Sequence, residues 1–585
     1  MRDASRDPGL PERYSVTDAE EFQFALTEEH YDELYGYLFP DGEGLLNRGS
    51  EPARDSTEDR PTGAEYLTGM RERGVIGIIT RSTGETRTTY LLKDIVAPTS
   101  DDDVYIDTRQ GHPRLLFSPG YRTRATARAA EVSGGGLVYF HSHPGGSAYP
   151  SDPDLRADRT RLYNAAKNLG PDVPLAAGII AERPRRESGH REWSFRAYEF
   201  DTPATVDDPD LKPTGEESAR QRHATAIRVV GPGFQKLATT HTSRAAGPAG
   251  ISGRVNPTEQ DSAVQLWGKR GQFALSGVRV GVVGCGGVGS YLAAELAMLG
   301  VGGAVFVDFD RVKPVNRNRA LGATKEDARH QRPKAEVARR VAEQHATAPG
   351  FEARAVVGSI VENQSPEHAA VGDLLDCDVI LNAADPHWVR MVVDELARAH
   401  LIPVINGGTD LRADKSADTM HPMSRSEITA TGPVHPCFEC QNVWMWGDRE
   451  EGVIRDKKPP ADRGGGPDLY AEPNDDDGAD APRDPSVAPT NGLVASIMAE
   501  RLQALIVGTT TETIVGGQRY RLYYGTMQWR SSDGERRTEC RGECTRPEAT
   551  ARGDTHDLGT GHDYDLRREL DAFTSIHDEL PGKDS

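Results

Sequence analysis

The sequence predicts an α/β protein with two successive domains, and three observations point to this fold class. The chain has 585 residues, which is too long for one hydrophobic core, and length alone suggests roughly three or four domains. Residues 278–310 follow the order strand, glycine turn, helix, strand and acid, which is typical of a mostly parallel sheet with crossover helices. Far upstream, residues 137–140 read as a separate apolar strand, and two histidines follow it.

The composition excludes several classes of function. The formal net charge of -21 argues against a surface that binds nucleic acid or an anionic membrane. No apolar run reaches ~18 residues, so no transmembrane helix is predicted, and the N-terminus lacks the apolar stretch of a signal peptide. Six cysteines in a chain of this length do not make a disulfide framework. We therefore expect a cytoplasmic protein without nucleic-acid or membrane partners.

Residues 1–20 are polar and expected to be disordered, and residues 21–205 are expected to form the first domain. Its first helix should begin near Thr27, because two glutamates follow in the first turn. Residues 48–72 are charged and rich in Gly, Pro and Ser, which predicts an exposed insertion. The remaining strands, with one helix at 155–169, are expected at 75–79, 88–95, 137–140, 175–180 and 193–200.

The strand at 137–140 leads into His141 and His143. Histidines at positions i and i+2 of a strand face the same side, so both imidazoles can reach one metal ion. Asp154 follows in the next loop, and Ser151 lies three residues before it. Two histidines, one aspartate and a water would complete an open, four-coordinate zinc site of the catalytic kind.

This pattern resembles the JAB/MPN metalloprotease motif (JAMM), H-x-H-x7-S-x-x-D. The resemblance implies an α/β metalloprotease domain with zinc on His141, His143 and Asp154, and with Ser151 helping to stabilise the oxyanion. It also implies cleavage of the bond after the C-terminal glycine of a ubiquitin-like protein.

The family needs an upstream glutamate that takes a proton from water. Glu43 is the first choice, because it follows the first helix where the next strand should begin. Glu33 and Glu65 remain as alternatives.

Residues 206–255 are expected to be a linker, and residues 256–545 a second domain. Residues 267–272 resemble the G-x-x-G-Q entry of the E1-like fold. In related enzymes an arginine near this entry reaches the nucleotide phosphates, often across a dimer interface. Arg270 and Arg254 both fit that description, and neither is assigned.

A nucleotide site is predicted at the glycine turn of residues 284–289, GCGGVG. It follows a valine-rich strand and opens a helical pattern at Ser290, and the next strand ends in Asp308. This order puts a phosphate on a helix N-terminus and an acidic side chain on a ribose.

The polar residues that follow resemble the E1-like ThiF/MoeB superfamily, whose pattern is D-x-D-x-V-x-x-x-N-L-x-R and then a lysine. Only the leucine differs, being Arg317 here. The resemblance implies a Rossmann-like domain that activates the C-terminus of a ubiquitin-like protein with ATP. The residues implied to bind the nucleotide are Gly284, Gly286, Gly289, Asp308, Asp310, Asn318, Arg319 and Lys334.

A further strand at 379–381 leads into residues 382–385, NAAD, which resemble the D-A-T-D motif of that family. By this match Asp385 binds Mg²⁺, and it acts with Arg319 and Lys334 in catalysis. Asn382 replaces the first aspartate of the motif.

Two pairs of cysteines predict a structural zinc site with four sulfur ligands, a redox pair being the alternative. They are Cys437, Cys440, Cys540 and Cys544. The other two, Cys285 and Cys377, do not occupy the position expected of a thioester cysteine, although Cys377 and the zinc-site cysteines stay open.

Residues 449–484 are predicted to be a disordered insertion and residues 546–585 an acidic, mobile tail. Between them we expect a helix at 486–508 and strands at 520–524 and 528–530.

The sequence therefore predicts a bifunctional enzyme, a zinc isopeptidase joined to an ATP-dependent adenylyltransferase. Its cofactors would be ATP, Mg²⁺ and two zinc ions, one catalytic and one structural. Its partners would be a ubiquitin-like β-grasp protein, an E2-like or sulfur-donor protein, and a second copy joined through the E1-like domain. The alternatives are activation of a sulfur carrier, and a module that binds nucleotide and zinc without turnover.

Overall fold

The computed structural model describes the greater part of both domains. The candidate residues Glu43, Glu65, Cys540 and Cys544 lie outside the described ranges, as does the 449–484 segment apart from Asp456. The described residues are 21–39, 72–107, 114–144, 147–170, 172–183, 190–200, 219–241, 255–361, 370–414, 421–433, 435–438, 440–441, 456, 486–508, 517–523, 526–531, 550–558 and 560.

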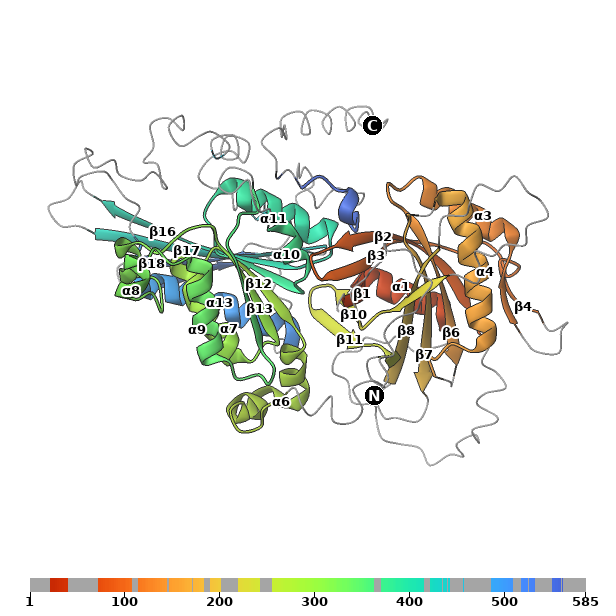
Figure 1. Ribbon diagram of the computed structural model, residues 1–585, viewed down its shortest axis with the longest axis horizontal. Coiled ribbons are helices and arrows are strands. Elements are labelled where there is room, and N and C mark those ends of the chain that lie inside the picture. The colour runs from red at the N-terminus through yellow and green to blue at the C-terminus, as the bar shows by residue number, and fades with distance from the viewer. Residues whose placement is uncertain are drawn as a thin grey trace, which may run out of the picture.

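The first domain is built on a nine-stranded sheet with the order β11-β10-β1-β3-β2-β6-β7-β8-β9. Figure 1 shows this domain, with most of its strands labelled. A small separate sheet pairs β4 with β5. The strands are β1 (Glu21–Thr27), β2 (Gly74–Thr83), β3 (Arg87–Val96), β4 (Val104–Asp107), β5 (Arg114–Phe117), β6 (Gly136–Pro144), β7 (Leu175–Arg183), β8 (His190–Glu199), β9 (Arg220–His223), β10 (Ala226–Val230) and β11 (Phe234–Ala238).

Helices cover both faces of this sheet. On one face α1 (Glu28–Leu38) packs against Phe22 and Phe24, which are alternate residues of β1, and against Trp193 of β8. On the other, α3 (Pro119–Ala130) and α4 (Asp152–Leu169) pack against Ile76 and Tyr139. Because successive side chains of a strand point to opposite faces, the face that carries Tyr139 also carries His141 and His143.

The region between the two domains differs from the sequence prediction. Residues 206–255 are predicted as a linker, but β9, β10 and β11 lie within them and belong to the first sheet. β10 pairs in parallel with β1 and brings the buried Ile227 and Val229 into the first core. The structure therefore assigns residues 220–238 to the first domain.

The second domain is built on an eight-stranded sheet with the order β14-β13-β12-β15-β16-β17-β18-β19. The pairings from β14 to β16 are parallel, and those from β16 to β19 are antiparallel. The α/β class and the Rossmann-like parallel half are thus confirmed. The strands are β12 (Arg279–Val283), β13 (Gly303–Val307), β14 (Glu352–Val356), β15 (Val379–Asn382), β16 (Val404–Asp414), β17 (His421–Thr431), β18 (Gly517–Tyr523) and β19 (Thr526–Ser531).

Two helical layers enclose this sheet. One core contains the apolar faces of α7, α9 and α13, and the other those of α10 and α11. Within the described ranges, none of the helices combines the length and the apolar character that crossing a membrane requires. The helices are α6 (Asp261–Ser276), α7 (Gly287–Leu299), α8 (Lys325–Arg329), α9 (Lys334–His345), α10 (Val371–Leu375), α11 (His387–Ala399) and α13 (Ala488–Val507), with 3₁₀ turns η3 (Pro314–Asn318) and η7 (Gly553–Thr555).

The two domains meet along a buried, charged seam. Asp378, which is fully buried just before β15, pairs with Arg87 at 2.9 Å and with Lys236 at 2.8 Å. Arg87 also pairs with Glu21 at 3.1 Å, and Asp376 accepts hydrogen bonds from the backbone of residues 86 and 87. The first domain therefore docks at the amino ends of β12 and β15.

The C-terminal segment 550–558 also lies across this seam. Ala551 N donates to Arg398 O, while Ala551 O accepts from Thr80 Oγ1 at 2.6 Å. Asp554 accepts two hydrogen bonds from Thr83, and Leu558 packs in the core beneath α11. This part of the predicted mobile tail thus joins both domains.

Candidate metal centre and nucleotide site

The first candidate site lies at the end of β6. His141 pairs with Gly74 of β2 and with Ile179 of β7, so strands on both sides fix its position. Its side chain is buried, and its Nε2 lies 3.2 Å from Nε2 of His143. The structure thus brings together the two histidines predicted to bind one ion.

Asp154 joins the histidines through the start of α4. Ser151 caps this helix: its Oγ accepts from Asp154 N, and its own N and Oγ donate to Asp154 Oδ2 at 2.7 Å. This reciprocal capping box orients the carboxylate. Its oxygens lie 3.7 Å from Nε2 of His141 and 3.6 Å from Nε2 of His143. One ligand atom from each of the three residues lies within 4.8 Å of the others.

The protonation of the two histidines suits metal binding. His143 Nδ1 lies 2.8 Å from the carbonyl oxygen of Ser147, which can only accept, so Nδ1 carries the proton and Nε2 is free to coordinate. Burial lowers the pKa of His141 to about 3, against the opposing charge of Asp154, and keeps its imidazole neutral. Two neutral imidazoles and one carboxylate that face one another fit a zinc ion with one open coordination position.

The pKa values of His143 and Asp154 shift in opposite directions. Burial alone would lower the pKa of His143, but its hydrogen bonds to Asp154 and Ser147 raise it. Burial alone would raise the pKa of Asp154, but His143, His141 and Ser151 hold it below its usual range. The aspartate therefore stays ionised and available as a ligand near neutral pH.

Glu72 also lies at this site, and the sequence reasoning missed it. It lies two residues before β2, and the neighbouring Arg73 exchanges hydrogen bonds with Ser142, the residue between the two histidines. Burial raises the pKa of Glu72; the charge of His143 opposes this effect, and that of Asp154 adds to it. A glutamate two residues before a buried strand was the available signal, but the predicted insertion at 48–72 concealed it.

The alternative Glu33 lies elsewhere. It is exposed on α1, on the face of the sheet opposite α4. Burial raises its pKa, and the charges that add to this effect belong to Asp94 and Glu29, neither of them at the metal centre.

The second candidate site lies at the carboxyl ends of β12 and β15. Gly284 adopts φ +87°, and a Cβ there would lie 3.0–3.1 Å from the backbone of residues 383 and 384. A Cβ on Gly289 would lie 1.9 Å from the carbonyl oxygen of Gly284. A Cβ on Gly286 would meet nothing within 4 Å, so this glycine borders open space. Two of the three glycines are therefore needed for the turn itself.

Asp308, Asp310 and Lys334 come together beside this turn. The buried carboxylate of Asp308 accepts from Cys285 N and from Asp310 N, both at 2.7 Å, and so joins the glycine turn to the end of β13. Lys334 Nζ donates to Asp310 Oδ2 at 2.5 Å. Burial raises the pKa of Asp308, whereas Asp308 and Asp310 outweigh burial and raise the pKa of Lys334. The lysine stays charged and can meet a phosphate.

Arg319 and Asp385 lie within electrostatic range of each other. Burial lowers the pKa of Arg319, and the charge of Asp385 opposes this effect. Arg319 donates to Val315 O at 3.1 Å, and its guanidinium lies 3.4 Å from the Asn318 amide oxygen. Asn318 thus lies beside Arg319 at the end of the 3₁₀ turn η3. The Asp385 side chain is 65% exposed and lies 3.9 Å from Arg390. A single exposed carboxylate fits Mg²⁺, which binds few protein ligands and shares substrate phosphates.

The described cysteines divide into two kinds. Cys437 and Cys440 form a compact turn in which Cys440 N donates to the sulfur of Cys437 at 3.5 Å. Cys285 and Cys377 are both buried, and burial raises the pKa of the Cys377 thiol to about 12 and raises that of Cys285 as well. Neither buried thiol offers an accessible thiolate.

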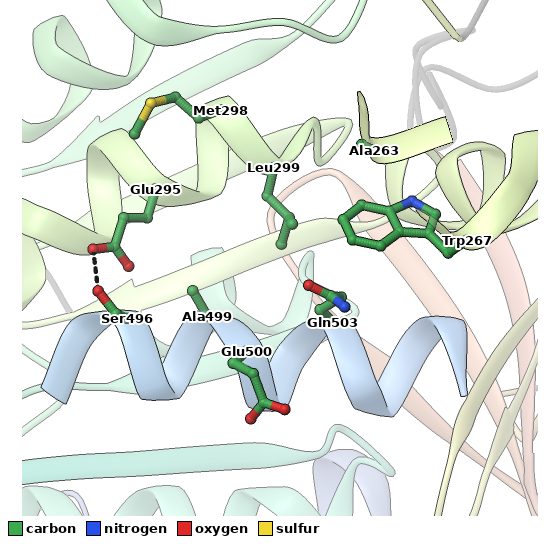
Figure 2. A pocket seen from close by; sticks show the side chains of 9 residues that line it. All are labelled: Ala263, Trp267, Glu295, Met298, Leu299, Ser496, Ala499, Glu500 and Gln503. Atoms are coloured by element: carbon green, nitrogen blue, oxygen red, sulfur yellow. Dashed lines mark hydrogen bonds between the residues drawn. The ribbon is translucent and has the colours of Figure 1, made fainter. Parts of the chain in front are cut away.

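A cavity opens between α6, α7 and α13, away from both sites, at the end of α7 far from its glycine turn. Figure 2 shows its lining, with Glu295 accepting a hydrogen bond from Ser496 at 2.8 Å. The lining residues are Ala263, Trp267, Glu295, Met298, Leu299, Ser496, Ala499, Glu500 and Gln503.

Two known proteins with curated descriptions are similar to parts of the chain. The "Adenylyltransferase and sulfurtransferase MOCS3" of Caenorhabditis briggsae is 28% identical over 178 residues, which are 30% of this chain and 39% of that protein. The "Uncharacterized protein y4oA" of Sinorhizobium fredii (strain NBRC 101917 / NGR234) is 52% identical over 50 residues, 8% of each chain. The chain thus spans less than half the length of these relatives.

Solved structures of E. coli MccB are also similar. The structure with succinimide has 18% identity and a TM-score of 0.34, and covers 49% of this chain and 75% of that one. The structure with ATP has 18% identity and a TM-score of 0.34, and covers 50% and 75%.

Two family models match, and each contains one of the candidate sites. Residues 70–196 match the model of prokaryotic homologs of the JAB domain, and they include Glu72 and the three metal-facing residues. Residues 259–542 match the ThiF family, and they include the glycine turn, Lys334 and Asp385. The chain therefore joins a prokaryotic homologue of the JAB domain to a domain of the ThiF family.

Proposed function

We propose that this chain acts twice on a ubiquitin-like protein. The first domain would cut the bond after the C-terminal glycine of that protein, and the second would activate the exposed carboxylate with ATP. The proposed cleavage rests on one observation: the side chains of His141, His143 and Asp154 converge, and they offer ligand atoms of the kinds that zinc prefers. Zinc bound there would supply Lewis-acid chemistry toward an amide carbonyl and a water molecule.

We assign the proton transfer of this cleavage to Glu72, in preference to Glu43, Glu33 or Glu65. A carboxylate with a raised pKa suits the step, because it can take the proton of the attacking water and pass it to the leaving amine. The amide C–N bond breaks and the water oxygen forms the new C–O bond. The match to the JAB homologs begins at residue 70, which supports Glu72 over the three upstream glutamates.

Ser151 remains the proposed donor to the oxyanion. Its hydroxyl proton points to Asp154 Oδ2 in the free protein, and its side chain is exposed. If the hydroxyl rotated, it would donate this hydrogen bond to the carbonyl oxygen of the substrate instead, as negative charge develops on that oxygen.

The second half is adenylation of a carboxylate. The C-terminal carboxylate of the partner would attack the α-phosphorus of ATP, forming a new O–P bond and releasing pyrophosphate. The convergence of Asp308, Asp310 and Lys334 at the glycine turn supports this half. Lys334 and Arg319 would offset charge on the phosphates, and Asp385 would hold Mg²⁺ against them.

ATP–pyrophosphate exchange tests the adenylation half. We expect exchange that depends on the ubiquitin-like protein encoded nearest this gene and that is lost in Asp385→Ala. Glu352→Ala is the matched control, because Glu352 is an exposed acid at the opposite, amino end of the parallel strands. ATP binding without exchange, for every candidate partner, would instead support a module that binds nucleotide without turnover.

Sulfur-carrier activation is the second candidate, and the match to the adenylyltransferase and sulfurtransferase MOCS3 favours it. The buried thiols of Cys285 and Cys377 also suit a mechanism that passes the acyl-adenylate to an E2-like or sulfur-donor protein. Mass spectrometry of the partner separates the two: a thiocarboxylate indicates sulfur transfer, and an amide-linked conjugate indicates protein modification.

We also propose a homodimer through the ThiF domain. Leu266 on α6 is 75% exposed, and Met298 beside the cavity of Figure 2 is 51% exposed. A second copy would cover both and could pair Lys269 or Arg270 with Glu295 or Glu500. Leu266→Glu should then yield a monomer in analytical ultracentrifugation, and an unchanged dimer would exclude this surface.

For the cysteines, we propose that Cys437 and Cys440 contribute two of four sulfur ligands to a structural zinc ion. Metal analysis of the Cys437→Ser variant should show one zinc fewer per chain than the wild type.

A further inference from the structure

One strand of the first sheet, β8, carries polar side chains on a face where the neighbouring strand β7 carries apolar ones. Glu192, Ser194 and Arg196 are alternate residues of β8, so all three face the side of the sheet that α4 covers. Arg196 is completely buried and Ser194 nearly so. The opposite face of the same strand is apolar, with Trp193 and Phe195 in the core under α1.

The strand between β8 and the metal centre has small side chains at the matching positions. Ala181 lies opposite Glu192, and Ala177 lies opposite Arg196. On its other side β7 pairs with β6, where Ala181 is the partner of His143. Adjacent strands lie about 4.8 Å apart, so β8 is about 10 Å from β6. Two alanines leave space through which longer side chains of β8 can extend past β7.

Arg196 extends toward the helix that carries Asp154. Its Nη2 donates to Asp158 Oδ2 at 2.9 Å, and its Nη1 donates to Ser194 Oγ at 2.8 Å. Asp158 is 1% exposed and lies one helical turn after Asp154 in α4. The pair therefore ties the first turns of α4, and with them the carboxylate of Asp154, to the sheet.

Glu192 extends toward the loop that holds His143. It accepts a hydrogen bond from Ser147 Oγ at 3.1 Å. The carbonyl oxygen of the same Ser147 accepts from His143 Nδ1 at 2.8 Å. One strand thus supports two of the three metal-facing side chains, each through a single intermediate residue.

Stability alone does not account for this arrangement. The cost of removing both charges from water offsets much of their attraction, and well-packed apolar pairs are often as stable as buried ion pairs. We propose that Arg196 and Glu192 are positioning residues of the metal centre, fixing Asp154 through Asp158 and His143 through Ser147. This inference rests on the zinc centre of the proposed function. Residues that orient metal ligands typically change metal affinity by about 10–100-fold when they are replaced.

The main variant is the double substitution Arg196→Met and Asp158→Leu, which replaces the ion pair by an apolar pair. Arg191→Met is the control, because Arg191 lies on the other face of β8, its guanidinium 3.8 Å from the Tyr35 ring centroid. Zinc affinity of the full chain is measured by competition with a chromophoric chelator, and folding of the metal-free chain by thermal unfolding. We expect zinc affinity about 10–100-fold weaker in the double variant and unchanged in the control.

Two further variants keep the test decisive if the double variant does not fold. Ser147→Ala removes the donor to Glu192 but keeps the carbonyl that fixes His143, and Glu192→Met removes the acceptor. Both should weaken zinc binding about 10-fold in a chain that unfolds like the wild type. Arg196→Lys keeps the charge but not the two-pronged donor geometry, and should restore part of the loss. At saturating zinc, the variants should show a lower kcat with an unchanged KM.

The outcomes separate this inference from the proposed function. A wild-type chain that binds no zinc would contradict the metal half of the proposed function. A wild type that binds zinc tightly, together with folded variants of equal affinity and kcat, would overturn the positioning role alone. Equal losses in the Arg191→Met control would show that the effect is a general consequence of disturbing β8, and would overturn it too.

Discussion

The metal centre and the nucleotide site are both built at strand ends, yet one is closed and the other open. His141 is only 4% exposed, and each metal-facing residue is hydrogen-bonded to the protein or to another member of the group. At the nucleotide site, the Asp385 side chain is 65% exposed and lies 3.9 Å from Arg390. A small ion needs donors that already converge, whereas a large ligand can bridge groups that lie apart.

The seam between the two domains lies at the opposite end of β12 from the nucleotide turn. The nucleotide turn lies at the carboxyl end of β12, and the buried seam with the first domain lies at its amino end. Five residues of strand separate these ends by about 16 Å. Changes at the seam should therefore affect the stability of the assembly more than the chemistry at the nucleotide turn.

The largest effect is expected for Glu72→Gln. If Glu72 carries the proton at the closed site, cleavage of a ubiquitin-like conjugate should fall by about 10²–10⁴-fold. Zinc affinity should stay the same, because the three metal-facing residues are intact. The matched control is Glu33→Gln, at an exposed position on α1. Cleavage at the wild-type rate by Glu72→Gln would rule out this assignment.

Asp378→Asn should disrupt the seam. The substitution leaves Arg87 and Lys236 buried beside a neutral amide, and breaking a buried ion pair costs about 3–5 kcal/mol. The free energy of unfolding from denaturant titration measures this loss, while exchange by the folded fraction should be unchanged. A stable variant with lost exchange would contradict the separation of seam and nucleotide site.

Lys334→Met tests the open site. Removal of one charge that stabilises the developing phosphate charge should lower pyrophosphate exchange by about 10²–10³-fold. Lys325→Met, on the short helix α8, is the control with an exposed lysine. If exchange survives in Lys334→Met, the ion pair with Asp310 is structural only.

The smallest effect concerns pH at the closed site. The pKa of His143 is raised, so Nε2 takes up a proton as pH falls through that pKa; zinc must then displace this proton, and its affinity should fall. The loss should be about tenfold per pH unit, one proton being released. His141, with a pKa of about 3, should add nothing between pH 5 and 8. Chelator competition across that range measures the slope, and a slope of two protons would contradict the assignment.

Much of each site could be predicted from local sequence. The spacing of His141 and His143 determines that they share one face of a strand, and Ser151 and Asp154 stand at the spacing of a capping box. The glycine turn likewise follows its strand directly, and a left-handed φ at Gly284 is a property of that single residue. These features depend on backbone geometry over a few residues, so the local sequence is enough to indicate them, although Asp154 lies in the first turn of α4 rather than in the expected loop.

Tertiary structure alone decided the features that join distant segments. Glu72 belongs to the metal centre because β2 pairs with β6, which brings together Arg73 and Ser142, 69 residues apart. The pairing of β10 with β1 places residues 220–238 in the first domain, and residues 550–558 cross the seam. Local periodicity determines which face a side chain takes, but it does not determine which strand becomes its neighbour. That choice depends on burial and hydrogen bonding summed over the whole sheet.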